Sequence, residues 1–257
     1  MRRRAWWGLA AVGLAAFLVF MVARWPAAHA WELARERMEL PPGVEVGAVT
    51  GTVWRGAIHG LRVEGVAITK LDWELRPTSL LRGRLDGSCD ASLADGHARG
   101  RFSVDRRGVT LLDADGRLAM SVLAEAAARI GGRSPDLEGT LLFAIPRARI
   151  DFAGSIETLE GRMAWHDAAV TVDRHARLGG FDARFEDDGE GGVVGTIEDT
   201  GGPLALSGDW RLGSDGRYGI DVVADTRAEA EPALGETLEM LGPRETDGFH
   251  IGLEGAL

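Results

Sequence analysis

Cysteine, lysine and tyrosine each occur only once in the 257 residues. With Cys89 alone, no intramolecular disulfide can form, so stability must come from an ordinary packed core. The sole lysine, Lys70, follows no glycine-rich loop, and the sequence has no G-x-S-x-G motif, which excludes the usual phosphate loop and hydrolase elbow. The six histidines are scattered singly, without the close spacing of a zinc site. We therefore predict no catalytic, cofactor-binding or metal-binding residues, and a protein that is not an enzyme.

Three local patterns resemble parts of known sites, and we interpret each as ordinary structure. His166-Asp167 has the order of an oriented general base, but no nucleophile accompanies it, so we expect a surface turn. The segment 113–116, DADG, is a fragment of a calcium loop without its distal acidic ligand, and a turn is expected there too. Asp90 should raise the pKa of the neighbouring Cys89 thiol, which argues against a reactive thiolate.

Acidic side chains outnumber basic ones by 39 to 29, giving a net charge of −10. Four arginines, Arg2, Arg3, Arg4 and Arg24, flank an N-terminal apolar run, and the chain without them has a net charge of −14. An acidic domain repels phosphate backbones, which excludes nucleic acid as a partner. The same charge argues against docking on anionic lipid headgroups through a basic patch.

Glycine is the abundant residue, with 36 copies, or roughly twice the usual share of about 7%. The glycines are scattered singly rather than in G-X-Y triplets, so a collagen helix is excluded. Single glycines between short apolar runs indicate many turns and bulges, and hence many strands.

The N-terminal segment has the properties of a membrane anchor. Residues 5–23 carry no charge, and at 1.5 Å per residue they span about 28 Å, close to the roughly 30 Å hydrocarbon core of a bilayer. Three arginines before the run against one after it predict that residues 1–4 stay in the cytoplasm. We therefore predict a transmembrane helix over residues 5–24, an inner-membrane location, and a periplasmic body.

Ala28-His29-Ala30 leaves a second interpretation open, because small-x-small is the pattern of a signal-peptide cleavage site. The apolar run is longer than that of a typical signal peptide, which favours a retained anchor. Cleavage after Ala30 would leave the body in the same compartment.

The remaining chain divides into a short helical part and a long β-rich part. Residues 25–43 are expected to form a stalk helix and linker, with the helix over Trp31–Leu40. Pro41-Pro42-Gly43 should end the helix, because proline cannot continue it and glycine relaxes the turn. From Val44 the hydrophobic period changes to two, so residues 44–257 are predicted to form a periplasmic β-rich domain. Two later stretches return to a helical period and should pack on the sheet, namely Leu118–Ile130 and Arg227–Leu241.

The predicted fold class is mainly β, with one strongly curved, mostly antiparallel sheet and about two packed helices. Asp-Gly pairs tolerate the positive φ angles of tight hairpins and therefore predict turns. The pairs are Asp86-Gly87, Asp95-Gly96, Asp115-Gly116, Asp215-Gly216 and Asp247-Gly248. The later predicted strands include Thr140–Ile145, Ile150–Phe152, Gly161–Trp165, Val170–Val172, Phe181–Phe185, Val193–Ile197, Leu204–Leu212 and Tyr218–Val223.

Two motifs near the start of this domain are more specific than the periodicity. The first is GTVWRG at 51–56, and the second is LDWELRPTSLLRGRL at 71–85. Together they resemble the type II secretion system protein N family, whose pattern is an N-terminal anchor, then G-T-x-W-x-G, then W-x-L-x-P-x-x-L-L-x-G-x-L. The matching residues are Gly51, Thr52, Trp54, Gly56, Trp73, Leu75, Pro77, Leu80, Leu81, Gly83 and Leu85.

The resemblance implies a non-catalytic inner-membrane component of the type II secretion machinery, which exports folded periplasmic proteins across the outer membrane. Its partners would be other components of that machinery in the inner membrane and periplasm, met by strand addition at sheet edges. From residue chemistry, we expect the motifs to determine the fold: Trp54 and Trp73 should fill the core, and Thr78–Leu81 should be a turn that docks two leucines. Contact of these residues with a partner is the second interpretation.

An AsmA-like envelope protein, handling lipid or another hydrophobic ligand on a curved sheet, is the alternative function. Leu141–Ile145 and Val109–Leu112 are apolar on both strand faces, as strands beside a ligand would be. Buried strands explain these two segments equally well. A groove lined by leucine and phenylalanine would favour the lipid ligand.

Overall fold

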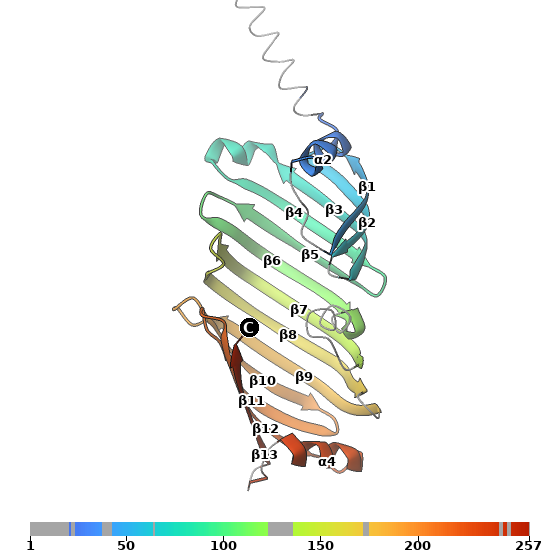
Figure 1. Ribbon diagram of the computed structural model, residues 1–257, viewed down its shortest axis with the longest axis vertical. Coiled ribbons are helices and arrows are strands. Elements are labelled where there is room, and N and C mark those ends of the chain that lie inside the picture. The colour runs from blue at the N-terminus through green and yellow to red at the C-terminus, as the bar shows by residue number, and fades with distance from the viewer. Residues whose placement is uncertain are drawn as a thin grey trace, which may run out of the picture.

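The structure, a computed structural model, contains one antiparallel sheet of thirteen strands, and each strand pairs with its neighbours in the sequence (Figure 1). It describes residues 21, 24–37, 43–63, 65–122, 136–171, 175–241, 244–245 and 248–256. The sheet is open, with β1 and β13 at its edges, and it is not strongly curled. The mainly β, antiparallel prediction is confirmed, whereas the strong curvature is wrong.

Short hairpins connect the strands, which is why consecutive strands are antiparallel neighbours. The strands are β1 (Val44–Gly51), β2 (Arg55–Val63), β3 (Val66–Arg76), β4 (Leu85–Leu93), β5 (Gly96–Val104), β6 (Gly108–Ala119), β7 (Asp136–Asp151), β8 (Ile156–Thr171), β9 (His175–Asp187), β10 (Val193–Gly201), β11 (Leu204–Leu212), β12 (Arg217–Thr226) and β13 (Phe249–Ala256). The helical elements with described bounds are α2 (Ala27–Arg35), the 3₁₀ element η1 (Pro77–Arg82) and α4 (Pro232–Leu241).

The helices differ from the predictions mainly at their ends. α2 begins four residues before the predicted stalk helix and ends at Arg35. α4 begins at Pro232, inside the predicted range, because the fixed φ of proline suits the first turn of a helix. In the segment predicted as a helix over 118–130, Leu118 and Ala119 belong to β6, residues 120–122 are helical as predicted, and residues 123–130 lie outside the described part of the chain.

The predicted membrane span, residues 5–24, lies outside the described residues except for Met21 and Arg24. Among the described residues, no helix combines the length and the apolar composition that crossing a membrane requires.

Six aromatic rings on one face of the sheet lie across glycines, and we call this the aromatic face. In each pair the two residues are directly opposite on adjacent strands, and a Cβ on the glycine would lie less than 3.0 Å from the ring. The pairs are Trp73 with Gly56, Phe102 with Gly87, Phe143 with Gly116, Phe185 with Gly161, Trp210 with Gly195, and Tyr218 with Gly255. Part of the high glycine content therefore serves to make room for aromatic rings within strands.

This packing explains which Asp-Gly turns were predicted correctly. Asp95-Gly96 and Asp215-Gly216 lie at the β4–β5 and β11–β12 hairpins, as predicted. Asp86-Gly87 and Asp115-Gly116 instead lie within β4 and β6, where each glycine sits beneath one of the six aromatic rings. In the fifth pair, Asp247 lies outside the described residues.

A β-bulge shifts the alternation of side chains within a strand, so one long strand is predicted as two short ones. The four short strands predicted between 140 and 172 are two 16-residue strands, β7 and β8, with bulges at Ala144–Arg147 and Trp165–Ala168. The His166-Asp167 pair lies in the second bulge, with Asp167 at φ +53°. Asp113, at φ +46°, lies at a bulge in β6. The turns expected at these two places are wrong, because a bulge produces the same positive φ inside a strand.

α4 packs on the aromatic face at the C-terminal end of the sheet (Figure 1). Leu234 and Leu238 of α4 are 6% and 4% exposed, and they share one core cluster with the strand residues Ala168, Phe181, Leu204, Val222, Ala224, Phe249 and Ile251. The prediction of a helix that packs one face on the sheet is confirmed here.

The opposite face of the sheet is charged, and we call it the charged face. Ion pairs between adjacent strands join Arg55 to Glu74 and Arg101 to Asp113 on this face. Exposed pairs of this kind contribute at most about 1 kcal/mol each, so they favour solubility more than stability.

Candidate functional site

β13 is an edge of the sheet that the rest of the described chain leaves open. On its inner side β13 pairs with β12 from Phe249 to Ala256. On its outer side there is one isolated bridge, between Phe249 and Arg244. From Gly252 to Ala256, the outer side has no pairing partner among the described residues.

The backbone phase of β13 shows which groups point outward. The Gly248 carbonyl accepts a hydrogen bond of 2.7 Å from the Glu245 N–H, next to the Arg244–Phe249 bridge on the outer side. N–H and C=O groups alternate between the two sides of an antiparallel strand, so Gly252 and Glu254 also direct theirs outward. These unpaired donors and acceptors form a template for another strand.

The two edges of the sheet differ in how far they are protected. Neither β13 (FHIGLEGA) nor β1 (VEVGAVTG) contains proline, lysine or arginine, the residues that commonly prevent pairing at an edge, so the difference lies in what covers each strand. At the other edge, the Val53 N–H donates to the Trp25 carbonyl at 3.0 Å and Thr52 bridges Pro26, and α2 lies beside β1 (Figure 1). The preceding segment thus covers part of the β1 edge, and we take β13, whose outer side has only the Arg244 bridge among the described residues, as the free edge.

The side chains of β13 give this edge two distinct faces. Leu253 lies on the aromatic face and is 53% exposed. On the charged face, the Glu254 carboxylate forms an ion pair with the Arg211 guanidinium at 3.3 Å. Asp221 lies opposite Gly252 on the same face. An incoming strand would meet apolar surface on one side and carboxylates on the other.

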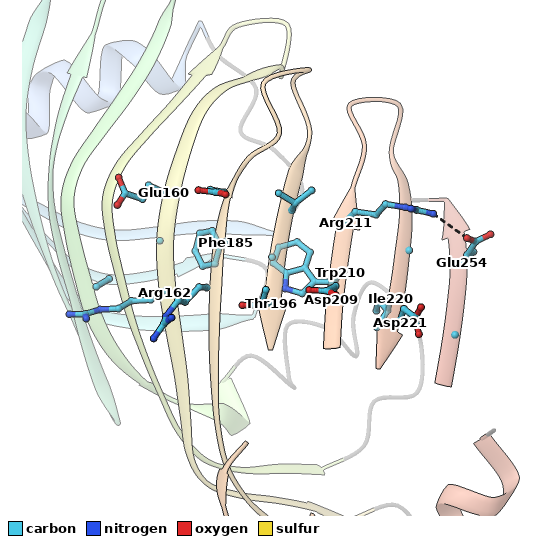
Figure 2. Close-up of a pocket in the computed structure, with 18 of the residues that line it drawn as sticks. Glu160, Arg162, Phe185, Thr196, Asp209, Trp210, Arg211, Ile220, Asp221 and Glu254 are labelled. Atoms are coloured by element: carbon cyan, nitrogen blue, oxygen red, sulfur yellow. Dashed lines mark hydrogen bonds and ion pairs between the residues drawn. The ribbon is translucent and has the colours of Figure 1, made fainter. Parts of the chain in front are cut away.

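A groove of about 1310 Å³ crosses β7 to β13 (Figure 2). Its lining includes Phe185 but no leucine, so it does not favour an acyl chain. Eight charged residues line it: Glu160, Arg162, Arg184, Glu186, Asp209, Arg211, Asp221 and Glu254. Arg162 lies directly opposite Arg184, an arrangement of like charges that is unfavourable within a sheet.

The first motif builds the turn between β1 and β2. Gly51 ends β1 at φ +88°, a conformation that glycine adopts without strain. The Thr52 N–H donates to the Arg55 carbonyl at 2.8 Å, and the Arg55 N–H donates to Thr52 Oγ1 at 3.2 Å. Gly56 lies in β2 beneath the ring of Trp73.

Trp73 and Leu75 connect this turn to β3. The indole Nε1–H of Trp73 donates to the Val53 carbonyl at 2.9 Å, and the Leu75 N–H donates to the Trp54 carbonyl at 2.7 Å. Both tryptophans are half-buried. The two motifs, separated in the sequence, are thus brought together at one corner of the sheet.

The second motif also ends β3 and forms η1. Pro77 begins η1, and Gly83 closes it at φ +70°. The predicted turn is present, but the docking of its two leucines is wrong, because Leu80 is 50% exposed and Leu81 is 90% exposed. The buried residue of this turn is Ser79, which is 3% exposed.

Among the described residues, the Cys89 thiol and the carboxyl groups of Asp105 and Asp199 have shifted pKa values, and none of the three lies at the β13 edge. Burial, followed by the charge of Asp90, raises the pKa of Cys89, which is the predicted direction. Burial acts to raise the pKa of Asp199, but an ion pair of 2.7 Å with Arg227 and backbone hydrogen bonds hold it below its ordinary value. Backbone hydrogen bonds lower the pKa of Asp105. Within the described ranges, no three His, Cys, Asp or Glu side chains cluster as a metal site would require.

The sequence did not identify the β13 edge, because periodicity predicts strands but not their order. Composition gives no separate signal, because β1 at the opposite edge lacks proline and basic residues just as β13 does.

Comparison with known proteins gives a family match over most of the chain. Residues 42–251 match the family described as Type II secretion system (T2SS), protein N. The chain is 37% identical to the type II secretion system protein N of Aeromonas hydrophila over 75 residues, which cover 29% of this chain and 28% of that protein. It is 33% identical to the protein of the same name from Vibrio cholerae serotype O1 over 55 residues, which cover 21% and 22% of the two chains. The matches thus span less than a third of either relative, and no solved structure matches.

Proposed function

From the premise that this chain belongs to the type II secretion system protein N family, we propose that it is a non-catalytic inner-membrane component of the type II secretion machinery. Residues 5–24 anchor it with the N-terminus in the cytoplasm, and the sheet lies in the periplasm. It takes part in the export of folded periplasmic proteins by binding other components of the machinery.

The free β13 edge is the observation that supports this proposal. Strand addition needs outward N–H and C=O groups and no blocking residue, and β13 meets both conditions at Gly252 and Glu254. The charged groove has no comparable feature that favours an enzymatic role, and the described residues hold no cluster suited to a metal ion.

The position of this edge suits a component that reaches away from a membrane. α2, which follows the proposed anchor, lies at the β1 end of the sheet, and β13 lies at the opposite end (Figure 1). Twelve spacings of about 4.8 Å separate β1 from β13 along the sheet, or about 58 Å. The partner strand would therefore be bound well above the bilayer surface.

Gly252 provides a matched pair of variants to test the proposal. Nothing lies within 4 Å of a Cβ added at Gly252, so alanine fits there and keeps the outward N–H. Proline removes that N–H, and strand edges tolerate it where the N–H faces solvent. In cells that lack the natural copy, Gly252→Ala should restore secretion of a type II substrate and Gly252→Pro should not, at equal protein levels on immunoblots.

The use of the β13 edge and the role in secretion can each be contradicted separately. Full restoration by Gly252→Pro would show that the β13 edge is not used. Normal secretion in cells that lack the protein altogether would remove the role in secretion itself.

A further inference from the structure

η1 exposes two leucines that are consecutive in the sequence, Leu80 and Leu81. Leu81 is 90% exposed and Leu80 is 50% exposed, which makes Leu81 the most exposed of the large apolar side chains described. Both belong to the motif at 71–85, and neither is buried.

The turn does not need these leucines for its own structure. The Ser79 hydroxyl donates to the Arg76 carbonyl at 2.6 Å and accepts a hydrogen bond from the Asp86 N–H at 2.9 Å, which fixes η1 to β4. The Gly83 N–H closes the turn on the Leu80 carbonyl at 3.0 Å. The turn therefore holds two apolar side chains in water although its own hydrogen bonds do not require them.

The charges around η1 favour a phosphate-bearing surface. Arg76 and Arg82 flank the leucine pair, both are exposed, and neither has an ion pair with a described residue. Arg84, the next arginine, pairs with Asp86 at 3.2 Å. The net charge of −10 argues against lipid docking by the domain as a whole, and the turn is a local basic exception to it.

The place of η1 in the molecule also fits a membrane. Figure 1 shows the turn between β3 and β4 at the same end of the sheet as α2, and far from α4. If residues 5–24 form the anchor, as in the proposed function on which this step rests, η1 lies next to the periplasmic surface of the same bilayer.

We propose that η1 is a second membrane contact, in which Leu80 and Leu81 insert among the acyl chains and Arg76 and Arg82 bind lipid phosphates. Leucines below the headgroups and arginines at their level are the arrangement of interfacial membrane segments. With the anchor, this contact fixes the orientation of the sheet, so that β13 points away from the bilayer.

A fluorescent label at position 81 tests this contact directly. The full chain, with Cys89→Ala and Leu81→Cys, is labelled with an NBD dye and reconstituted in vesicles of phosphatidylethanolamine and phosphatidylglycerol that contain spin-labelled lipid. The matched control carries the dye at Leu253→Cys, another exposed leucine at the far edge. We expect blue-shifted emission and several-fold stronger quenching by the spin-labelled lipid at position 81 than at position 253.

Flotation of the vesicles on a density gradient separates this inference from the anchor. A chain that floats with the vesicles but shows equal, weak quenching at both positions overturns the η1 contact and leaves the anchor intact, and a protein would then be the better candidate to cover the leucines. A chain that neither floats nor is quenched overturns both. Arg82→Glu should reduce the quenching at position 81 in the floated protein, and an unchanged signal would contradict the phosphate contact.

Discussion

The ring of Phe185 lies across Gly161, its direct partner on the adjacent strand, and the three atoms nearest to where a Cβ of residue 161 would be all belong to this ring. Gly161→Ala should therefore lower the free energy of unfolding by about 1–3 kcal/mol, as expected for an overpacked contact. Urea denaturation measures this change. Gly252→Ala is the control, and since that site is open it should change stability by less than about 0.5 kcal/mol.

A double variant tests the cause of that effect. In a Phe185→Leu background, the cost of Gly161→Ala should fall, because the side chain that it overlaps has become smaller. An equal cost in both backgrounds would show that the backbone, and not the ring, requires glycine at this position.

Phe249 should be among the residues that the fold needs most, since it is 2% exposed and lies between α4 and the sheet. Phe249→Ala should cost about 3–5 kcal/mol. Leu81→Ala, at a position 90% exposed, should cost less than about 0.5 kcal/mol. Similar losses for the two variants would contradict the burial described here.

Asp199→Asn should lower the free energy of unfolding by about 1.5–3 kcal/mol near neutral pH, the range for hydrogen bonds to charged groups. The pKa of Asp199 is lower in the folded state than in the unfolded state. Its contribution is therefore present above the unfolded pKa of about 3.9 and is lost as the pH falls through the folded pKa. The difference between the native protein and the variant should shrink below about pH 4.

Urea unfolding at a series of pH values measures this difference. Glu45→Gln, which removes an exposed ion pair with Arg62, is the control and should cost less than about 1 kcal/mol. A loss for Asp199→Asn that stays constant on acidification would rule out the Arg227 pair as its cause.

Cys89 should react slowly with thiol reagents in the native protein. Burial and the neighbouring Asp90 raise its pKa, so little thiolate is present at neutral pH. Asp90→Asn should increase the rate by lowering that pKa, and unfolding in urea should increase it more. Absorbance with a disulfide reagent follows the reaction, and equal rates in the native and unfolded protein would contradict the effect of burial.

The period of two predicted the sheet well, because polar and apolar side chains alternate along most of the strands. The predicted strand Leu204–Leu212 coincides with β11. The role of a glycine, in contrast, depends on the residue opposite it on the next strand, which no local pattern contains. Gly87 was predicted to form a turn, and it instead lies beneath the ring of Phe102.

The candidate surfaces were less predictable than the sheet. Leucines are mostly buried, so a docked pair was the natural expectation for Leu80 and Leu81. Hydrogen bonds of the Ser79 hydroxyl, and not packing of the two leucines, fix the turn to the sheet. Hydrophobic patterning does not reveal such an arrangement. The open edge at β13 depends on strand order, which follows from the complete set of pairings.

Site-specific photo-crosslinking in living cells tests the central claim, that the β13 edge binds another component of the secretion machinery. A photoreactive amino acid at position 253 should give an adduct with a type II secretion component, identified by mass spectrometry. The same residue at position 142, a leucine 37% exposed in the middle of the sheet, should not. No adduct at position 253, or an adduct only with a second copy of this chain, would contradict the account.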